Sequence, residues 1–341
     1  MNLNLIGKAV LLSSLLVGLG GLPLAGQNKL AGQDKLAGQD KLASEADAST
    51  YAVTAPPEGL KLDPFYTKHV SASGYPIVSS GQVSDYALRE AAWLVDQMLA
   101  ERPDVREAML KSGSRLCIMA HNEFTTELPE WRWMADPQHD GRESRGVSAR
   151  DYWDARARGM GGSETDPLCS CAEENLLGYA GDPYSTECIL IHEFAHNIHL
   201  RGMMQIDPEF DRRLRAAYDA AMAAGLWKGV YAAVNHYEYF AEGVQNWFSN
   251  NREPDHDHNH VNTREELEVY DPELAKLCRE VFGDTKLVYT KPATRLSGHL
   301  AGYDPGTSPE FQWPERLQRA QEAIYAEAVR RNREAQADKR P

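Results

Sequence analysis

The sequence predicts one domain that combines α-helices with β-strands, and three observations support this prediction. Between Ser84 and Pro103, apolar side chains recur every three or four residues, which is the period of an amphipathic helix. The segment "RLCIMA", residues 115 to 120, is a short apolar run typical of a buried strand. From residue 207 onward, most of the chain has helix-forming patterns.

The composition is that of a globular protein without a polyanionic partner. The 341 residues are 42% hydrophobic and 25% charged, and they accommodate one large domain or two small ones. We assign residues 56 to 313 to one domain. The formal net charge of −14 repels polyanions, and no basic patch offsets it. We therefore expect neither a nucleic-acid nor an anionic-membrane partner.

The N-terminal residues 1 to 26 have the layout of a secretory signal peptide. Lys8 precedes an apolar run that turns to small residues and then to polar sequence. An uncleaved membrane anchor is the alternative, but the run falls short of the roughly 20 residues that a spanning helix needs. We expect cleavage, no membrane attachment afterwards, and a secreted, periplasmic or extracellular location.

Two further segments flank the domain. Residues 27 to 55 repeat "LAGQDK" with no apolar face, so we expect a flexible tether rather than a β-helix, which would need inward-facing apolar side chains. Residues 314 to 341 are helix-prone and highly charged, which indicates a surface helix that frays into a tail.

Five cysteines suit an oxidising compartment, where one or two disulfides form or the thiols stay buried. Their pairing cannot be read from spacing. Cys169 and Cys171 form a C-x-C without a second cysteine pair, which argues against a thiolate zinc site.

The remaining elements follow in chain order. Ser84 is expected to cap the first helix, a short helix then ends near Gly113, and "HNEFTTELPEW" suits a loop at a cleft rim. A short strand is expected within residues 168 to 178. Farther on, a helix is expected to start with Asp207 as its cap and Pro208 at its first position, and to stop before Gly225.

The segment "ILIHEFAHNIHLRG", residues 189 to 202, carries the strongest chemical signal. His192 and His196 are one helical turn apart, so both rings reach one tetrahedral ion, and Glu193 lies beside them. Ionisable groups on so apolar a helix are costly unless they pair or bind a metal. A satisfied structural pair of histidines is the alternative.

His199 does not join this ligand set. It lies seven residues after His192, about 10.5 Å farther along the helix axis, which is too far for three rings to meet one ion. The longer pattern H-E-x-x-H-x-x-G-x-x-H is also absent, because its final histidine would be residue 202, which is Gly202. We expect Gly202 to end the helix instead.

A second helix can supply the missing ligand. Asn235 can cap the segment "HYEYFAEGVQNWF", whose Glu238 and Glu242 lie one turn apart at the border of its apolar face. Two buried carboxylates favour a cation. Glu238 also lies three residues past the cap, so a capping role is the alternative.

"HEFAH" followed by "EYFAE" resembles the gluzincin zinc metallopeptidases, in particular the branch with anthrax lethal factor and the Pro-Pro endopeptidases. The resemblance covers only about residues 185 to 250. It implies that Glu238 is the third Zn²⁺ ligand and that Glu242 supports a ligand histidine. It also implies that Tyr231, seven residues before Glu238, stabilises the oxyanion.

The same resemblance implies an α+β, zincin-like fold with a mixed sheet, an active-site helix and a mainly helical C-terminal half. One edge strand would pair with extended substrate, and we place it in residues 168 to 178. The glycine-rich "RGMGGSE", residues 158 to 164, precedes this segment and could equally be a lid.

The expected function is hydrolysis of a peptide or protein substrate by a secreted zinc endopeptidase, with Glu193 as the general base. A binding module with a structural or vestigial metal is the alternative from another class. A glycoside hydrolase is disfavoured, because adjacent acids such as Glu173 and Glu174 do not flank a bond from opposite faces.

Other polar residues are weaker candidates. The loop "DHDHNH", residues 255 to 260, is either solvated or a second metal site. His121, Glu123 and His236 are possible cleft residues, and His236 is the one we most expect to assist.

Overall fold

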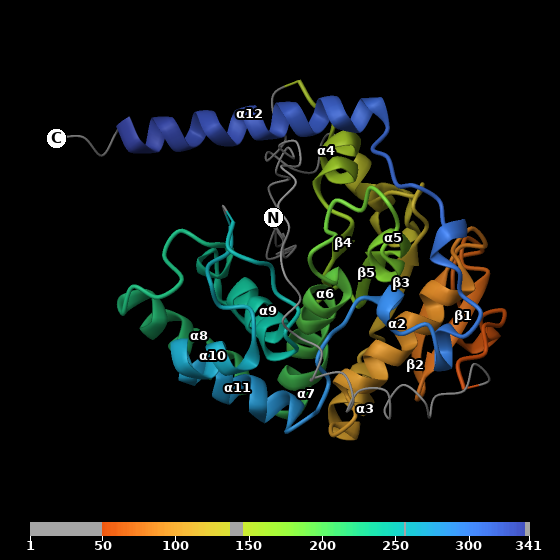
Figure 1. Cartoon of the computed structure of the whole chain (residues 1–341), viewed down its shortest axis with the longest axis horizontal. Coiled ribbons are helices and arrows are strands. Elements are labelled where there is room, and N and C mark those ends of the chain that lie inside the picture. The colour runs from red at the N-terminus through yellow and green to blue at the C-terminus, as the bar shows by residue number, and fades with distance from the viewer. Residues whose placement is uncertain (1–49, 137–145, 256, 338–341) are drawn as a thin grey trace, which may run out of the picture.

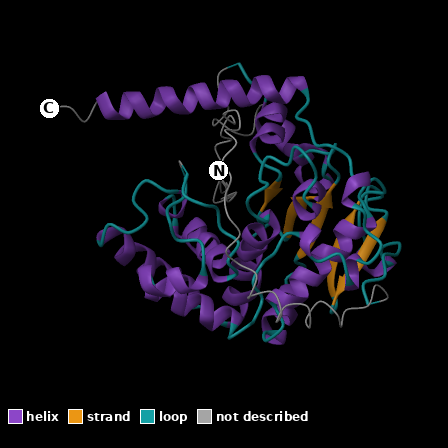
Figure 2. Ribbon diagram, viewed as in Figure 1, coloured by secondary structure: helices purple, strands orange, loops and turns teal. Residues whose placement is uncertain are grey.

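The computed structural model of the chain describes residues 50–136, 146–255 and 257–337, and shows a mixed five-stranded sheet with helices on both faces (Figures 1 and 2). The sheet lies on one side of the molecule, a helical half lies on the other, and α6 runs between them. This architecture confirms the expected mixture of helices and strands. The strands are β1 (Lys68–Ala72), β2 (Tyr75–Ser79), β3 (Arg115–Met119), β4 (Gly159–Met160) and β5 (Leu168–Ala172).

Most of the helices follow the last strand, β5, along the chain. The first four helices lie between or beside the strands, and the later ones form the helical half of the chain. In chain order they are α2 (Asp85–Met98), α3 (Pro103–Lys111), α4 (Ala149–Arg156), α5 (Glu173–Leu177), α6 (Ile189–Asn197), α7 (Met204–Ile206), α8 (Phe210–Ala223), α9 (His236–Trp247), α10 (Arg264–Tyr270), α11 (Pro272–Phe282) and α12 (Glu315–Ala337).

The strand order is β1-β2-β3-β5-β4, and β4 forms the edge nearest the motif helix. The pairs β2–β3 and β3–β5 are parallel, whereas β1–β2 and β4–β5 are antiparallel. Our expectation of an edge strand in residues 168 to 178 is therefore wrong. The strand β5 lies inside the sheet, residues Glu173–Leu177 form helix α5, and the glycine-rich segment supplies the edge.

Both faces of the sheet are buried, and the side chains of β3 alternate between them as strand geometry requires. Leu116 and Ile118 join the main core with α2, α6 and α9. Cys117 and Met119 instead join a second cluster, which includes Trp131 from the 3₁₀-helix Pro129–Ala135 and Trp153 from α4.

All five cysteines are buried free thiols. Cys169 and Cys171 are two residues apart on β5, so both face the main core, whereas Cys117 faces the other side of the sheet. The strand register thus keeps Cys117 apart from the C-x-C pair. Of our two expectations, buried thiols describe the structure and disulfides do not.

Local sequence signals locate several helix ends correctly. The Ser84 side chain accepts from the backbone N–H of Tyr86, as expected for an N-cap. Gly225 follows the end of α8 with φ +77°. The start of that helix was predicted too early, because the Asp207 side chain accepts from the Glu209 N–H in a turn and α8 begins at Phe210.

Gly202 does not end the motif helix, contrary to our expectation. The helix continues from α6 through a π-helical turn, Ile198–Met203, into α7. A Cβ on Gly202 would lie 2.7 Å from the side chain of Val105 on α3. Gly202 is therefore suited to the close approach of α3, and not to a left-handed cap.

The glycines around β4 let this edge lie directly on α6. A Cβ on Gly159 would lie 2.5 Å from Cγ2 of Ile189, and a Cβ on Gly161 would lie 2.6 Å from Cδ2 of His196. The N–H of Gly162 donates to Oδ1 of Asn197 at 2.9 Å. Backbone without side chains can thus cover the helix turn that carries the motif.

The regions flanking the domain are described in part. Residues 1 to 26 and most of the expected tether lie outside the described residues. Within residues 50 to 55, Tyr51 is buried and donates to Asp96, and Thr54 pairs with His69.

Helix α12 packs on α4 through a small cluster that includes Leu317, and Figure 1 shows it extending beyond the rest of the fold. Among the described residues, no helix is both long and apolar enough to span a membrane.

We expect Gly159→Ala to destabilise the zinc-free protein by about 1 to 3 kcal/mol, because the new methyl overpacks a fixed backbone contact. The backbone oxygen of Ser170 lies 2.9 Å from that Cβ position and cannot turn away. The free energy of unfolding is measured by urea denaturation. Gly59→Ala is the matched control, since no atom lies within 4 Å of its Cβ position. Equal stability of the two variants would contradict the close packing of β4 on α6.

Candidate metal centre

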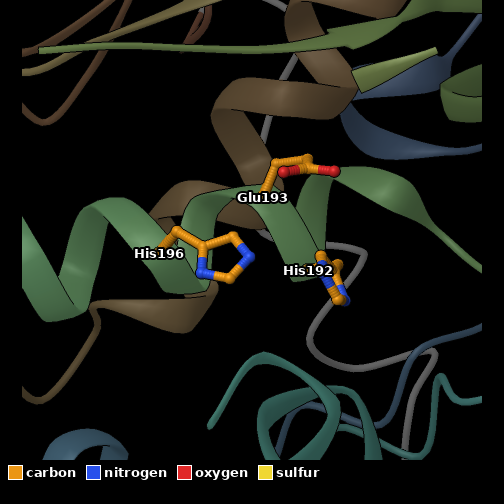
Figure 3. Close-up of side chains that lie close together, drawn as sticks. All are labelled: His192, Glu193 and His196. Atoms are coloured by element: carbon orange, nitrogen blue, oxygen red, sulfur yellow. The ribbon is translucent and has the colours of Figure 1, made fainter. Parts of the chain in front are cut away.

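Helix α6 brings three ionisable side chains together in the protein interior. His192, Glu193 and His196 are buried, and one ligand atom from each lies within 4.8 Å of the others. Figure 3 shows both imidazoles on one side of the helix and the Glu193 carboxylate on another. The spacing of four residues places the two rings one turn apart, as the sequence predicts.

Helix α9 packs against α6 and places Glu238 opposite the two histidines. Asn235 caps α9, because its side chain accepts from the N–H groups of Tyr237 and Glu238. The Glu238 side chain points to the histidines: its Oε2 lies 3.1 Å from Nε2 of His192 and 3.5 Å from Nε2 of His196. The carboxylate contacts thus favour a site role for Glu238 over the capping role.

These distances and the unsatisfied atoms fit a metal ion. A tetrahedral zinc ion about 2.0 to 2.1 Å from each ligand places neighbouring ligand atoms roughly 3.3 to 3.4 Å apart. Within the described part of the chain, Nε2 of His196 and Oε1 of Glu238 are buried without a hydrogen-bond partner. Buried polar atoms are seldom left so, and a cation bound by these residues would satisfy them.

The electrostatics of the site are those of buried charges that stabilise one another. Burial opposes a charge on His192, but its hydrogen bond to Glu238 and the charge of Glu193 outweigh this cost and raise its pKa to about 10. Burial also opposes ionisation of Glu238, but the nearby histidines lower its pKa to about 2. Several carboxylates around His192 create a negative environment that suits a divalent cation.

The other ring nitrogen of His192 faces residues of α9. Nδ1 lies 2.8 Å from Oε1 of Gln245 and 3.6 Å from Oε1 of Glu242. Glu242, expected to support a histidine, is thus close to His192 but beyond direct hydrogen-bond distance. We did not predict Gln245. Its position seven residues after Glu238, on the same helix face, was the available signal.

Tyr231 lies near the histidines but on a separate short 3₁₀-helix, Tyr231–Ala233. It is buried, and its ring centroid lies 6.1 Å from that of His192. Its N–H donates to the carbonyl of Asp257 at 2.7 Å. The loop after α9 therefore holds the backbone of Tyr231 beside the site.

The remaining histidines and acids form other contacts. Nε2 of His199 and Nε2 of His236 each lie 3.2 Å from Oδ1 of Asp211, on α8. His199 is thus outside the candidate centre, as expected, and His236 contacts Asp211 of α8. The two other residues proposed for the cleft have nearby partners. His121 contacts Glu173, and Glu123 accepts from the N–H of Ala120.

His258, which follows α9 in the chain, contacts a carboxylate beside the candidate centre. Nδ1 of His258 is 2.9 Å from Oδ1 of Asp255, and its Nε2 is 3.6 Å from Oε2 of Glu242. Burial opposes a charge on His258, but Glu242 outweighs this cost and raises its pKa to about 9. The described residues of the loop 255 to 260 form no group of three ligand side chains within 4.8 Å, and residue 256 lies outside them.

Comparisons with known proteins show a distant similarity to solved structures. No protein-family model matches the chain, and no curated protein sequence matches it. A similar solved structure is that of the Pro-Pro endopeptidase PPEP-2 from Paenibacillus alvei, at 14% sequence identity and a TM-score of 0.41. The match covers 60% of this chain and 97% of that chain. A similarity at this level carries no argument about function, which depends on the site geometry.

We expect Glu238→Gln to weaken zinc binding by at least about 100-fold. Changing a residue that only supports a ligand costs up to about 100-fold, and loss of a ligand should cost at least as much. The substitution replaces an anionic oxygen with a neutral amide that faces both histidines. Zinc affinity is measured by competition with a chromophoric chelator. His199→Gln, on the same helix but directed to Asp211, is the control and should bind zinc like the wild type. Undiminished binding by Glu238→Gln would exclude Glu238 as a ligand.

Proposed function

We propose that the chain is a secreted zinc metalloendopeptidase that hydrolyses peptide bonds. The observation that carries the proposal is the contact of one Glu238 oxygen with Nε2 of both His192 and His196, next to the Glu193 carboxylate. This set of nitrogen and oxygen ligands suits zinc. Three protein ligands leave a position open, as in catalytic rather than structural zinc sites.

His192, His196 and Glu238 would hold the ion, and Glu193 would act on the reactants. A bound zinc ion supplies Lewis acidity, which polarises a carbonyl and lowers the pKa of a water molecule. Glu193 accepts a proton from the attacking water and passes it to the leaving amine. One carboxylate thus serves first as base and then as acid.

The surroundings of Glu193 suit this proton transfer. Burial raises the pKa of Glu193, which makes its carboxylate a stronger base than an exposed one. The charges of His192 and His196 oppose that rise, and the backbone N–H of Gly161 hydrogen-bonds to the carboxylate. The edge segment therefore orients the proposed base.

Tyr231 would donate a hydrogen bond to the carbonyl oxygen as negative charge develops on it. Its burial beside His192 supports this role. Glu242 would contribute through the charge network around His192, since its oxygen lies 3.6 Å from Nδ1.

The substrate would be a peptide or protein bound in extended form along β4. This strand is the edge of the sheet next to the motif helix, and edge strands accept an extra strand through backbone hydrogen bonds. Substrate would therefore pair with β4 and not with β5, which lies inside the sheet. Secretion rests on the signal-like residues 1 to 26, and the net charge of −14 argues against a nucleic-acid partner.

A binding module with a structural metal remains the alternative from another class. Four protein ligands close a structural zinc site, and here the two histidines and Glu238 are three. One Glu193 oxygen lies within 4.8 Å of a ring nitrogen of each histidine. Because the two histidines and Glu238 already supply three ligands, this proximity favours a role of Glu193 on the reactants.

We expect Glu193→Gln to slow cleavage of a mixed peptide library strongly while zinc stays bound, because only the proton acceptor is lost. The loss in kcat/KM should reach roughly 100- to 10,000-fold, the usual contribution of general acid–base catalysis. Products are identified by mass spectrometry and zinc content by metal analysis. Cleavage by Glu193→Gln at the wild-type rate would rule out the proposed mechanism, and the wild-type products would define the specificity.

We expect Tyr231→Phe to lower kcat by about 100- to 1,000-fold with KM and zinc content unchanged, since a single donor to the oxyanion has effects of this size. Steady-state kinetics on a peptide found in the library screen measure the change. Tyr237→Phe is the matched control, because the Tyr237 hydroxyl contacts Arg215 on α8. If the two variants have equal kcat, Tyr231 has no catalytic role.

A further inference from the structure

Gln245 bridges a histidine of the candidate metal centre and a carboxylate outside it. It lies on α9, seven residues after Glu238, and its side chain is fully buried. Its Oε1 is 2.8 Å from Nδ1 of His192, and its Nε2 donates to Oε2 of Glu187 at 2.7 Å. The amide thus has one defined partner at each end.

The Glu187 carboxylate fixes the direction in which this amide points. The amide nitrogen of Gln245 donates to Oε2 of Glu187, and this is the direction that an accepting carboxylate requires. The amide oxygen then faces His192, and because that oxygen only accepts, Nδ1 must carry the ring proton. Without a metal, Nε2 also carries a proton and donates to Glu238, 3.1 Å away. A zinc ion would take the place of that proton, so the bound ring would be neutral, with its remaining proton on Nδ1 and its lone pair on Nε2.

Burial and polar neighbours shift the pKa of Glu187 in opposite directions. Burial raises its pKa, whereas Arg252 and the hydrogen bond from Gln245 oppose this rise and favour the carboxylate. The Nε of Arg252 lies 3.8 Å from Oε1 of Glu187. Glu187 therefore has a cation on one side and the Gln245 amide on the other.

Glu242 is the competing partner of His192, but its geometry is weaker. Its Oε1 is 3.6 Å from Nδ1, which exceeds hydrogen-bond distance. Its other oxygen accepts from Nδ2 of Asn251 at 2.9 Å. His196 has no such support, since its Nδ1 lacks a hydrogen-bond partner among the described residues. Gln245 is therefore the residue that hydrogen-bonds directly to the outer ring nitrogen of His192.

We propose that Gln245, oriented by Glu187, is a positioning residue that keeps His192 in the tautomer whose Nε2 binds zinc. The inference rests on the proposed function, because it requires His192 to be a zinc ligand. Glu187 lies just before α6 and Gln245 on α9, so the same bridge ties together the two helices that carry the ligands. Such outer hydrogen bonds set ring orientation and ligand basicity in metal sites.

The test compares Gln245→Met with Asn246→Leu in the full chain. Gln245→Met keeps the side-chain length and removes both hydrogen bonds, whereas Asn246→Leu removes a buried amide at the next position of α9. We expect Gln245→Met to bind zinc about 10- to 100-fold more weakly, measured by chelator competition, because the loss of an outer partner has this effect. Asn246→Leu should bind zinc like the wild type.

A second measurement reports the tautomer itself. Long-range nitrogen–proton NMR spectra of the zinc-loaded, ¹⁵N-labelled chain show which ring nitrogen of His192 carries the proton. We expect it on Nδ1 in the wild type and in Asn246→Leu, with its proton signal shifted or lost in Gln245→Met. A purely structural Gln245 would change thermal unfolding but leave this signal and the zinc affinity unchanged, which would overturn the proposal. A wild-type proton on Nε2 would overturn it too.

Glu187→Gln provides an independent variant if Gln245→Met does not fold. It lets the Gln245 amide point either way, so zinc affinity should fall in the same direction, and unchanged affinity would count against the proposal. A wild-type chain that binds no zinc would overturn the proposed function together with this inference. A wild type that binds zinc, with Gln245→Met binding it equally well, would overturn the inference alone.

Discussion

The packing of α6 against α9 is the contact on which the rest of the site depends. It brings His192 and His196 against Glu238, whose backbone lies 42 residues beyond His196, and it removes all three from water. Isolated charges at this depth would be costly, so each must be neutralised by a partner. The aromatic and aliphatic faces of the two helices provide the apolar burial that holds these charges together. The polar site is thus a patch inside a larger hydrophobic contact.

The sheet contributes by fixing α6 from its other side. The strand β5 and the glycine-rich edge β4 lie against the helix, and Gly161 packs on the ring of His196. His192 and His196 are therefore held differently. One ring has a hydrogen-bonded partner in Gln245, whereas the other is confined by backbone packing. Both constraints limit the motion of ligands that must keep a fixed geometry.

Features that depend on neighbours along the chain were predictable from sequence. The spacing of His192 and His196, the Asn235 cap and the buried strand around Cys117 all follow from helix and strand periods. Features that depend on distant contacts were not. Gly202 looks like a helix terminator, but its environment is set by α3. The short β4 consists only of Gly159 and Met160, and glycine is not a usual strand residue. Gln245 reads as an ordinary polar residue until the positions of Glu187 and His192 are known.

The free thiols described above bear on how such a chain could mature. Burial raises the pKa of all five cysteines, to about 12 for Cys188, so the folded protein exposes almost no thiolate to oxidants. The unfolded chain has no such protection, because its thiols are solvated and titrate normally. If the chain is exported into an oxidising compartment, as proposed above, its folding would compete in time with oxidation of its own thiols. Fast formation of the core would therefore protect these thiols.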